Sequence, residues 1–291
     1  MLSLLEILQK TTSFLASRGI ENPRLNAELL VGHALGLKRM ELYLQFERLL
    51  PEADLEKIRP LVKKRSQRQP LQYILGEVEF AGVKLKVDRR ALIPRPETEL
   101  LVELLTQKCA ASPPRQVLDL GTGTGALALA LATAFPAAMV LAVDRSPDAL
   151  ALAQENCAAL QLTDRVTVRA SDWFSAIEAG RRFDLIVSNP PYLAVEDVTA
   201  ASPEVREFEP HAALVAAEDG LADLRRIIAS APACLEPGGW LALETGIGHH
   251  AALAAACEAA GLTDFETVKD LTGRDRFVLA RAAREGETLN A

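Results

Sequence analysis

The sequence contains few cysteines and no long apolar run. Its four cysteines, Cys109, Cys157, Cys234 and Cys257, lie far apart and form no Cys-x-x-Cys pair. This spacing argues against a disulfide framework and a cysteine-based zinc site, so we expect reduced thiols in a cytoplasmic protein without a metal. No apolar run reaches the roughly 18 residues that a membrane-spanning helix needs, so no membrane partner is expected.

Internal repeats and low-complexity segments are also missing from the 291 residues. Hydrophobic residues make up 49% of the chain and charged residues 24%, which is typical of a globular protein with one large or two smaller domains. The first 19 residues include Glu6 and Lys10 within an apolar pattern. This pattern indicates an amphipathic helix and not a signal peptide.

The net charge of -7 is unevenly distributed. Residues 1–90 carry 16 Lys and Arg against 11 Asp and Glu, a net +5, and the remainder carries 16 against 28, a net -12. The basic part, densest in the run KKRSQR from Lys63, is either a solvated helical face or a surface for an acidic partner. The acidic part is poorly suited to binding a phosphate backbone.

The first 70 residues have the pattern of a small helical bundle. Asn22 is a candidate N-cap, with Pro23 at the first helical position and Gly36 at the helix end. A third helix is expected over residues 39–50 and a fourth from Pro51 to about Gln69. The next segment, GEVEFAGVKLKV, alternates apolar and polar residues around Ala-Gly, which predicts a hairpin. We expect a helical domain over residues 1–72, a hairpin linker over 73–92 and a third segment over 93–291.

Strands alternate with helices after residue 115, which predicts a doubly wound, mostly parallel α/β sheet. The predicted strands are apolar and are followed by helical patterns. The strand patterns are QVLDLG, AMVLAVD, VTVRASD, FDLIVSNPPY, WLALETG and a last one near RFVLARAA.

A glycine-rich loop follows the first of these strands. It spans DLGTGTG, Asp119 to Gly125, and Asp144 ends the next strand. Glycines allow a tight turn and close approach of a ligand, and a carboxylate at Asp144 can accept hydrogen bonds from ribose hydroxyls. The pattern fits a dinucleotide, but it also resembles the first motif of class I S-adenosylmethionine-dependent methyltransferases. A purely structural turn is the third interpretation.

Asp172 and Trp173 end the third strand. Asp172 could accept from an adenine amino group and Trp173 could stack on the ring, or the pair could be a helix N-cap and a core aromatic. We favour the binding interpretation, because many class I methyltransferases make adenine contacts at this position.

The segment NPPY, Asn189–Tyr192, ends the fourth strand. Two prolines stiffen the backbone there. A stiff backbone suits a site that holds a ligand with fixed acceptors. The segment is similar to the motif of methyltransferases that modify planar amino groups, and this resemblance implies that the Asn189 side-chain oxygen and the Pro190 carbonyl accept the two hydrogens of such a group. These acceptors would stabilise the charge that develops on nitrogen during methylation. Tyr192 would pack against the planar group. A structural Asn-Pro turn is the alternative.

NPPY resembles the motif of methyltransferases that modify planar amino groups. With IPRPETE, DLGTGTG, FEPHAAL, EDGL and DLTGRDR, it makes nearly the whole chain similar to the bacterial N5-glutamine methyltransferases of peptide chain release factors. This resemblance implies a seven-stranded class I methyltransferase sheet behind a helical domain. It also implies S-adenosylmethionine as cofactor, S-adenosylhomocysteine as product, and the Gly-Gly-Gln glutamine of class I release factors as substrate, in support of translation termination.

The same resemblance implies roles for individual residues. Asn189 and Pro190 would be catalytic, and Arg95 would either bind a cofactor carboxylate or pair with Glu97 or Glu99. The sequence departs from the family pattern at HAAL, which begins at His211, and at residues 244–249. We therefore assign no role to His211, Glu244 or His249. Cofactor-binding residues would be Gly121, Thr122, Gly123, Thr124, Gly125, Asp144, Trp173 and Asn189, and substrate-binding residues Asn189, Pro190, Pro191 and Tyr192. We add Asp172 to the cofactor-binding residues because it lies at the same strand edge as Trp173.

Three other functions are compatible with part of the pattern. An N-methyltransferase for adenine or cytosine in nucleic acid would use the same chemistry, but the acidic catalytic part disfavours it. A non-catalytic adaptor for release factors would not need an intact NPPY, and a nicotinamide dehydrogenase has no use for that motif. We therefore expect a monomeric enzyme that modifies a protein and has no direct nucleic-acid substrate.

Overall fold

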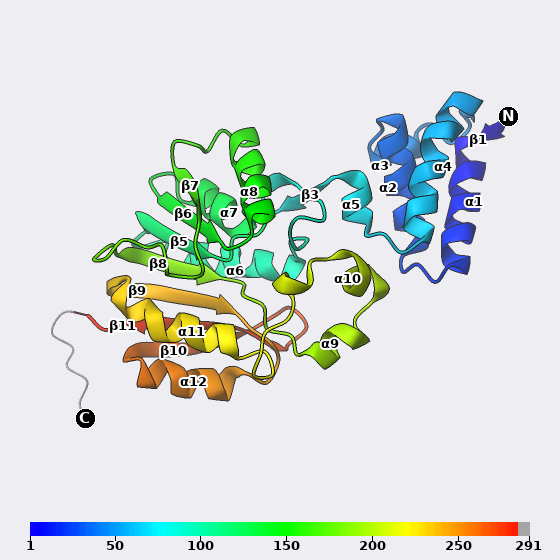
Figure 1. Ribbon diagram of the computed structural model, residues 1–291. Coiled ribbons are helices and arrows are strands. Elements are labelled where there is room, and N and C mark those ends of the chain that lie inside the picture. Colours follow the sequence, from blue (N-terminus) through cyan, green and yellow to red (C-terminus); the bar gives the residue numbers. More distant parts are fainter. Residues whose placement is uncertain (285–291) are drawn as a thin grey trace. The chain divides into compact units, whose positions relative to one another are not determined.

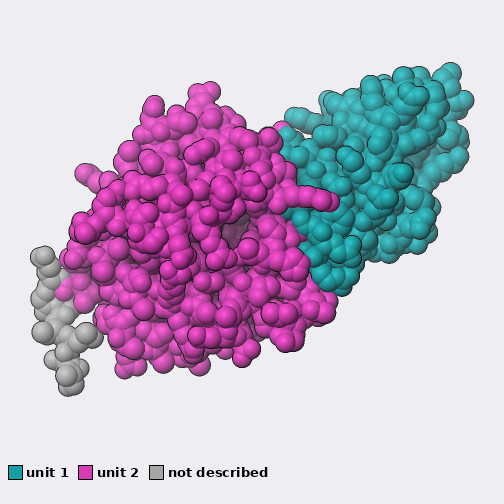
Figure 2. All heavy atoms as spheres, in the orientation of Figure 1, with its two compact units in different colours: residues 1–77, 202–208 teal, residues 78–201, 209–291 magenta. Residues whose placement is uncertain are grey.

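The computed structural model describes residues 1–284, and the chain divides into two compact units (Figures 1 and 2). Unit 1 comprises residues 1–77 and 202–208, and unit 2 comprises residues 78–201 and those from 209 onward. Among residues 1–284, no helix has the length and apolar character needed to span a membrane. The four cysteines are free thiols.

Unit 1 is a bundle of helices around two apolar clusters. Leu4, Leu8 and Val31 belong to one cluster, and Leu15 and Leu30 belong to the other. Its elements are β1 (Leu2–Ser3), α1 (Leu4–Ser17), α2 (Pro23–Leu35), α3 (Arg39–Tyr43), β2 (Leu49–Leu50), α4 (Glu52–Ser66), α5 (Leu71–Leu75) and α10 (Pro203–Phe208).

The helix expected over residues 39–50 is shorter than predicted. It ends at Tyr43, because residues 49–50 pair as a strand with residues 2–3, and this long-range pairing overrides the local helical pattern. Gly36 ends α2 with φ of 67°, as predicted. Asn22 stands at the N-cap position, but its side chain makes no capping hydrogen bond.

Helix α10 joins unit 1 although its sequence lies far from the other helices. Glu204 Oε1 accepts from Arg65 Nη2 at 2.9 Å, and Glu204 Oε2 lies 2.8 Å from Arg68 Nη2. Arg65 is buried and also donates to Asn26 Oδ1 at 2.7 Å. Residues separated by about 140 positions are therefore held together by charge-assisted hydrogen bonds.

Unit 2 contains a seven-stranded sheet in the order β10-β11-β9-β8-β5-β6-β7. Strands β7, β6, β5, β8 and β9 run parallel, whereas β11 is antiparallel to both β9 and β10. This confirms the predicted mostly parallel sheet. The strands are β5 (Gln116–Leu120), β6 (Met139–Asp144), β7 (Val166–Ala170), β8 (Phe183–Ser188), β9 (Leu235–Glu244), β10 (Leu262–Lys269) and β11 (Asp275–Ala282).

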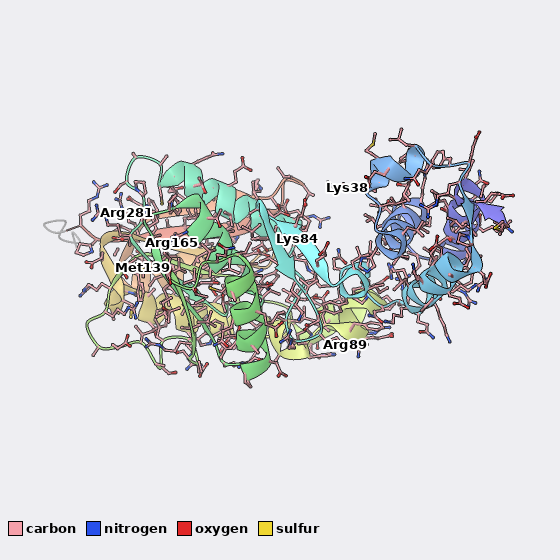
Figure 3. The ribbon with its side chains drawn as sticks, turned by 90° about the horizontal axis from the view of Figure 1, so that it is seen from above. Lys38, Lys84, Arg89, Met139, Arg165 and Arg281 are labelled. Carbon is pink, nitrogen blue, oxygen red and sulfur yellow. The ribbon has the colours of Figure 1, made fainter. Side chains whose placement is uncertain are left out.

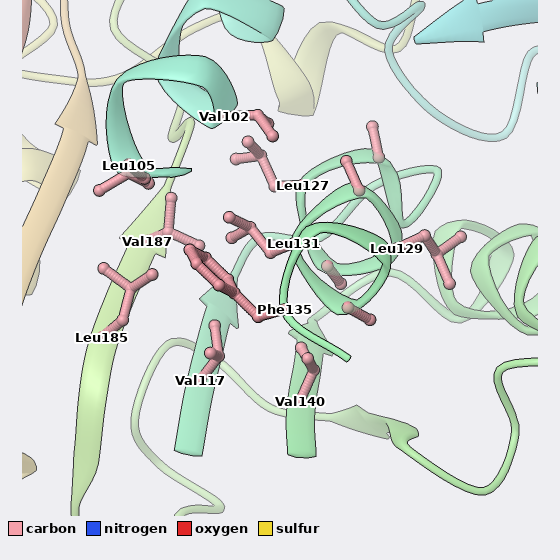
Figure 4. Close-up of a cluster of buried hydrophobic side chains, with 14 of the residues drawn as sticks. Val102, Leu105, Val117, Leu127, Leu129, Leu131, Phe135, Val140, Leu185 and Val187 are labelled. Carbon is pink, nitrogen blue, oxygen red and sulfur yellow. The ribbon is translucent and has the colours of Figure 1, made fainter. Parts of the chain in front are cut away.

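Helices and a small hairpin accompany the sheet in unit 2. Phe80, Val83 and Leu85 of the β3–β4 pair lie in the same buried cluster as α6 and α7, which Figure 4 shows against β5, β6 and β8. The elements are β3 (Glu77–Phe80, with Glu77 in unit 1), β4 (Val83–Lys86), α6 (Pro96–Lys108), α7 (Ala126–Ala134), α8 (Pro147–Ala159), α9 (Val195–Ala200), η1 (His211–Ala213), α11 (Ala222–Ser230), η2 (Ala231–Ala233) and α12 (His250–Ala259).

Near the N-terminal ends of the strands, one arginine side chain contacts three backbone carbonyls. Arg165, labelled with Met139 in Figure 3, donates through Nη1 to the carbonyl of Ala132 at 2.6 Å. The same nitrogen lies 3.4 Å from the carbonyls of Phe135 and Ala138. The Ala132 carbonyl lies in the last turn of α7, so the arginine satisfies a group that the helix leaves unpaired, and it also contacts the segment that follows the helix.

Two parts of unit 2 differ from the sequence expectation. The sequence pattern did not indicate β10, because Asp264 and Glu266 interrupt its apolar residues. The pattern GLADLRRIIASAPACL, residues 220–235, predicts one long helix that ends before Gly-Gly. In the structure α11 ends at Ser230 and β9 begins at Leu235, so Gly238 and Gly239 lie inside a strand.

Candidate functional site

One pocket in unit 2 opens at the ends of β5, β6, β7 and β8, where a parallel sheet is expected to bind ligands. Its lining includes nine of the residues singled out from the sequence as cofactor- or substrate-binding. They are Gly121, Thr122, Gly123, Thr124, Asp144, Asp172, Trp173, Asn189 and Pro191. Gly125, Pro190 and Tyr192 are not among the lining residues.

The glycine loop connects β5 to α7 in a left-handed backbone. Gly121, Gly123 and Gly125 have φ of 71°, 56° and 85°. A Cβ on Gly121 would lie 3.2 Å from Cζ3 of Trp173. Glycine is therefore required at position 121 by the backbone conformation and also by the indole packed against it. Gly125 does not line the pocket but caps α7.

Asp144 ends β6 and holds the loop in place. Its Oδ2 accepts from the Gly123 amide at 2.9 Å, and its Oδ1 accepts from the Ser146 amide at 2.9 Å. Each carboxylate oxygen has a further lone pair, so Asp144 can still accept from two ligand hydroxyls.

Asp119, to which the sequence analysis gave no role, is a buried carboxyl group in the pocket lining. Its Oδ2 accepts from Thr122 Oγ1 at 2.6 Å and from the Ala128 amide at 3.2 Å. Its Oδ1 is buried without a hydrogen-bond partner in the described part of the chain. Burial raises the pKa of Asp119 to about 7.

Trp173 and Asp172 lie at the pocket edge beyond β7. Trp173 is buried in the apolar cluster around β5 and β6, and its Nε1 donates to Asp223 Oδ1 at 3.1 Å. It is therefore both a core aromatic and a lining residue. The Asp172 side chain accepts two hydrogen bonds from Arg226 of α11, at 2.8 and 3.2 Å. Its carboxylate therefore forms an ion pair and does not cap a helix, which was the alternative considered above.

The NPPY segment lies where β8 ends. Asn189 Nδ2 donates to Thr98 Oγ1 at 3.2 Å, and the hydroxyl of Tyr192 donates to Glu244 Oε1 at 2.9 Å. Thr98 Oγ1 in turn donates to Glu244 Oε2 at 2.6 Å. Glu244 is buried, and burial raises its pKa and that of Tyr192.

Arg95 of the IPRPETE motif has a partner that the sequence did not suggest. Its Nη2 donates to Glu209 Oε1 at 2.6 Å, so the ion pair of Arg95 is formed with Glu209 and not with Glu97 or Glu99, which was one of the two alternatives. Glu209 is buried and also accepts from the Ile93 amide at 3.3 Å. Arg95 and Pro210 line the pocket, so this ion pair joins two parts of its wall.

Comparisons with known proteins agree on the family. Residues 6–76 match the family described as PrmC N-terminal domain, and residues 96–208 match the methyltransferase small domain. The release factor glutamine methyltransferase of Geobacter sulfurreducens is 44% identical over 95% of this chain and 95% of its own length. That of Deinococcus radiodurans is 45% identical over 97% of this chain and 99% of its own length.

The chain belongs to the release factor glutamine methyltransferase family.

Solved structures agree on the fold of this family member. The hMettl16 catalytic domain, solved with an RNA hairpin, has a TM-score of 0.60 at 19% identity and covers 79% of this chain and 84% of its own. A T. thermophilus 16S rRNA methyltransferase in complex with AdoMet and guanosine has a TM-score of 0.52 at 24% identity. It covers 71% of this chain and 49% of its own. At these identities the likeness concerns the methyltransferase fold alone.

Residues that sequence reasoning missed are mostly buried partners of predicted ones. Thr98, Glu244 and Arg276 surround Asn189 and Tyr192, and the Arg276 guanidinium lies 5.9 Å from the centroid of the Tyr192 ring. Thr98 lies within IPRPETE and Arg276 within DLTGRDR, so the motifs contained the signal but did not reveal the contacts.

Proposed function

We propose that this protein transfers a methyl group from S-adenosylmethionine to the side-chain amide N5 of the glutamine in the Gly-Gly-Gln motif of class I peptide chain release factors. One observation carries the proposal. Asn189 of NPPY lines the same pocket as the glycine loop and Asp144. The names of the family's curated members support the choice of substrate.

The pocket residues fit S-adenosylmethionine. The cofactor carries a positive amino group and a ribose, and supplies the electrophilic methyl group. The partnerless Asp119 Oδ1 is suited to accept from a cationic amino group, and Asp144 is suited to accept from ribose hydroxyls. Asp172 and Trp173 would contact the adenine, and the loop from Gly121 to Thr124 would bring its backbone close to the cofactor.

The chain's own contribution to the chemistry is to hold a weak nucleophile. An amide nitrogen has a delocalised lone pair, so the acceptors must align it and stabilise the positive charge that develops there. Asn189 Oδ1 and the Pro190 carbonyl would accept its two N–H groups, and Tyr192 would pack against the planar amide. No strong base is needed for this step, because the nitrogen proton becomes acidic upon alkylation.

A methyl-transfer assay tests the proposal directly. Labelled S-adenosylmethionine is offered with a purified release factor, with the same factor carrying Gln→Ala in its Gly-Gly-Gln loop, and with bulk DNA and RNA. We expect label on the intact factor only. Label on nucleic acid instead would assign the pocket to an exocyclic amino group of a base.

Asn189→Ala provides the residue-level test. We expect kcat to fall by about 10²- to 10³-fold, as when one preorganised polar group is removed from a transition-state site. Binding of release factor, measured by calorimetry, should change little, because Asn189 is one residue of a protein-protein interface. Undiminished transfer by this variant would rule out the assigned role of Asn189 and would leave the family membership intact.

We further propose that the helical domain, residues 1–72, contributes to the choice of protein substrate, with the hairpin of residues 73–92 as the link to the catalytic segment 93–291. The support is the net +5 charge of residues 1–90 against -12 in the remainder. Complementary charge increases association rates and disfavours wrong partners.

A further inference from the structure

A chain of hydrogen bonds connects Asn189 to a buried carboxyl group. Asn189 Nδ2 donates to Thr98 Oγ1 at 3.2 Å, and Thr98 Oγ1 donates to Glu244 Oε2 at 2.6 Å. The other oxygen, Glu244 Oε1, accepts from the Tyr192 hydroxyl at 2.9 Å. Three elements, α6, β9 and the segment after β8, meet in this chain.

Counting protons fixes the direction of the chain. An ionised carboxylate only accepts hydrogen bonds, so the single hydroxyl proton of Thr98 is directed to Glu244. Thr98 can then only accept from Asn189, and the only donor on that side chain is its Nδ2. The remaining amide atom, Asn189 Oδ1, is an acceptor and is the one left for a ligand of the pocket.

We propose that Thr98 and Glu244 are positioning residues that hold the Asn189 side chain with its oxygen, and not its NH2 group, available to the substrate amide. The inference rests on the proposed function, since the substrate must present N–H donors. The reverse orientation would point the Asn189 NH2 group at the substrate NH2 group and would provide no acceptor for the charge developing on nitrogen.

The groups around Glu244 determine at which pH it is protonated, and therefore at which pH the Asn189 side chain keeps its orientation. Burial raises the pKa of Glu244, and the charge of Glu97 of α6 adds to this effect. The hydrogen bonds from Thr98 and Tyr192 and the charge of Arg276 of β11 act in the opposite direction, and the pKa remains raised. Once protonated, Glu244 becomes a donor, and Thr98 is free to donate to Asn189 Oδ1 instead. Activity that depends on the ionised form is therefore present at higher pH and lost as pH falls through this raised pKa.

Substitutions at Thr98 test the inference. Thr98→Val removes the hydroxyl and keeps the shape, and we expect kcat to fall about 10- to 100-fold with the Kd for S-adenosylmethionine unchanged by calorimetry. Thr98→Ser restores the hydroxyl and should recover most of kcat. Thr106→Val is the matched control on the same helix, because Thr106 Oγ1 only donates to Val102 O within α6.

Glu244→Gln and a pH profile provide the second test, which does not depend on Thr98→Val folding. With saturating substrates, kcat of the unsubstituted enzyme should fall at acid pH, with an apparent pKa above the ordinary carboxyl range. This acid limb should be absent in Glu244→Gln, whose overall kcat is lower.

The outcomes separate the two hypotheses. Full activity of Thr98→Val, or an acid limb unchanged in Glu244→Gln, would overturn the positioning role while release-factor methylation stands. An unsubstituted enzyme that transfers no methyl group to the glutamine amide would overturn the proposed function itself.

Discussion

Two aspartates in the pocket have different environments although they lie on neighbouring strands. Asp144 accepts hydrogen bonds from two backbone amides, those of Gly123 and Ser146. Asp119 is buried, has one oxygen without a partner, and lies near enough to Asp144 for that charge to contribute to its raised pKa. A cationic group bound in the pocket would compensate the energetic cost of burying the Asp119 charge.

Asp119 predicts a pH-dependent stability of the protein without cofactor. Its pKa is about 7 in the folded chain against an ordinary 3.8, so the folded state holds a proton that the unfolded state has lost between these values. This contribution is fully present below the unfolded pKa and is lost as pH rises through about 7, with a slope of up to about 1.4 kcal/mol per pH unit. Urea unfolding between pH 4 and 8 measures it.

Asp119→Asn is the comparison for that measurement. The amide has no charge to bury, so the variant should lose this part of the slope. Equal slopes in the two proteins would show that Asp119 is not protonated in the folded state.

At the scale of elements, the segment after β8 depends on a distant loop. Leu193 forms a parallel bridge with Val215, and its amide donates to the Leu214 carbonyl at 3.0 Å. Gly220, with φ of 88°, comes so close that a Cβ there would lie 2.1 Å from the Tyr192 carbonyl oxygen. The position of NPPY is therefore determined partly by the EDGL motif.

Gly220→Ala should displace the Tyr192 backbone. We expect a loss of roughly 2–4 kcal/mol in the free energy of unfolding, from left-handed strain and from the clash, and a lower kcat. Gly248→Ala is a matched control, because Gly248 has φ of 89° and nothing within 4 Å of the added Cβ. Denaturant unfolding of both variants isolates the contribution of the clash to the free energy of unfolding. Equal losses of this free energy in the two variants would contradict a clash at Gly220.

At the scale of the whole molecule, the chain combines a basic helical unit with an acidic catalytic one. Lys63 and Lys64 are exposed in the last turn of α4, whereas Arg65 of the same run is buried and paired with Glu204. Only part of the KKRSQR run is therefore available to a partner. Arg65 serves the internal structure of unit 1.

Reversing the two exposed charges tests the role of unit 1. We expect Lys63→Glu with Lys64→Glu to raise KM for full-length release factor about three- to tenfold, since steering by charge is weakened, and to leave a short Gly-Gly-Gln peptide unaffected. Lys10→Glu with Arg18→Glu changes the charge equally elsewhere in unit 1. Equal effects of the two pairs in steady-state assays would contradict a local surface at Lys63.

The sequence by itself determined the class of the fold and the chemistry of the site. Apolar strands alternating with helices predict a parallel sheet, and DLGTGTG and NPPY follow strands directly, so their places at the strand ends follow from chain connectivity. Local turns such as Gly36 were also predictable, because a left-handed residue at a helix end is a local requirement.

Only the tertiary structure decided which buried groups pair. The partners lie 91 to 146 residues apart in the sequence. They are Arg95 with Glu209, Thr98 with Glu244, and Thr98 with Asn189. Nothing in a local pattern distinguishes Glu209 from Glu97 as the partner of Arg95. A buried polar group must find its partner wherever the packed elements bring one within hydrogen-bond distance, and that distance is set by the fold as a whole.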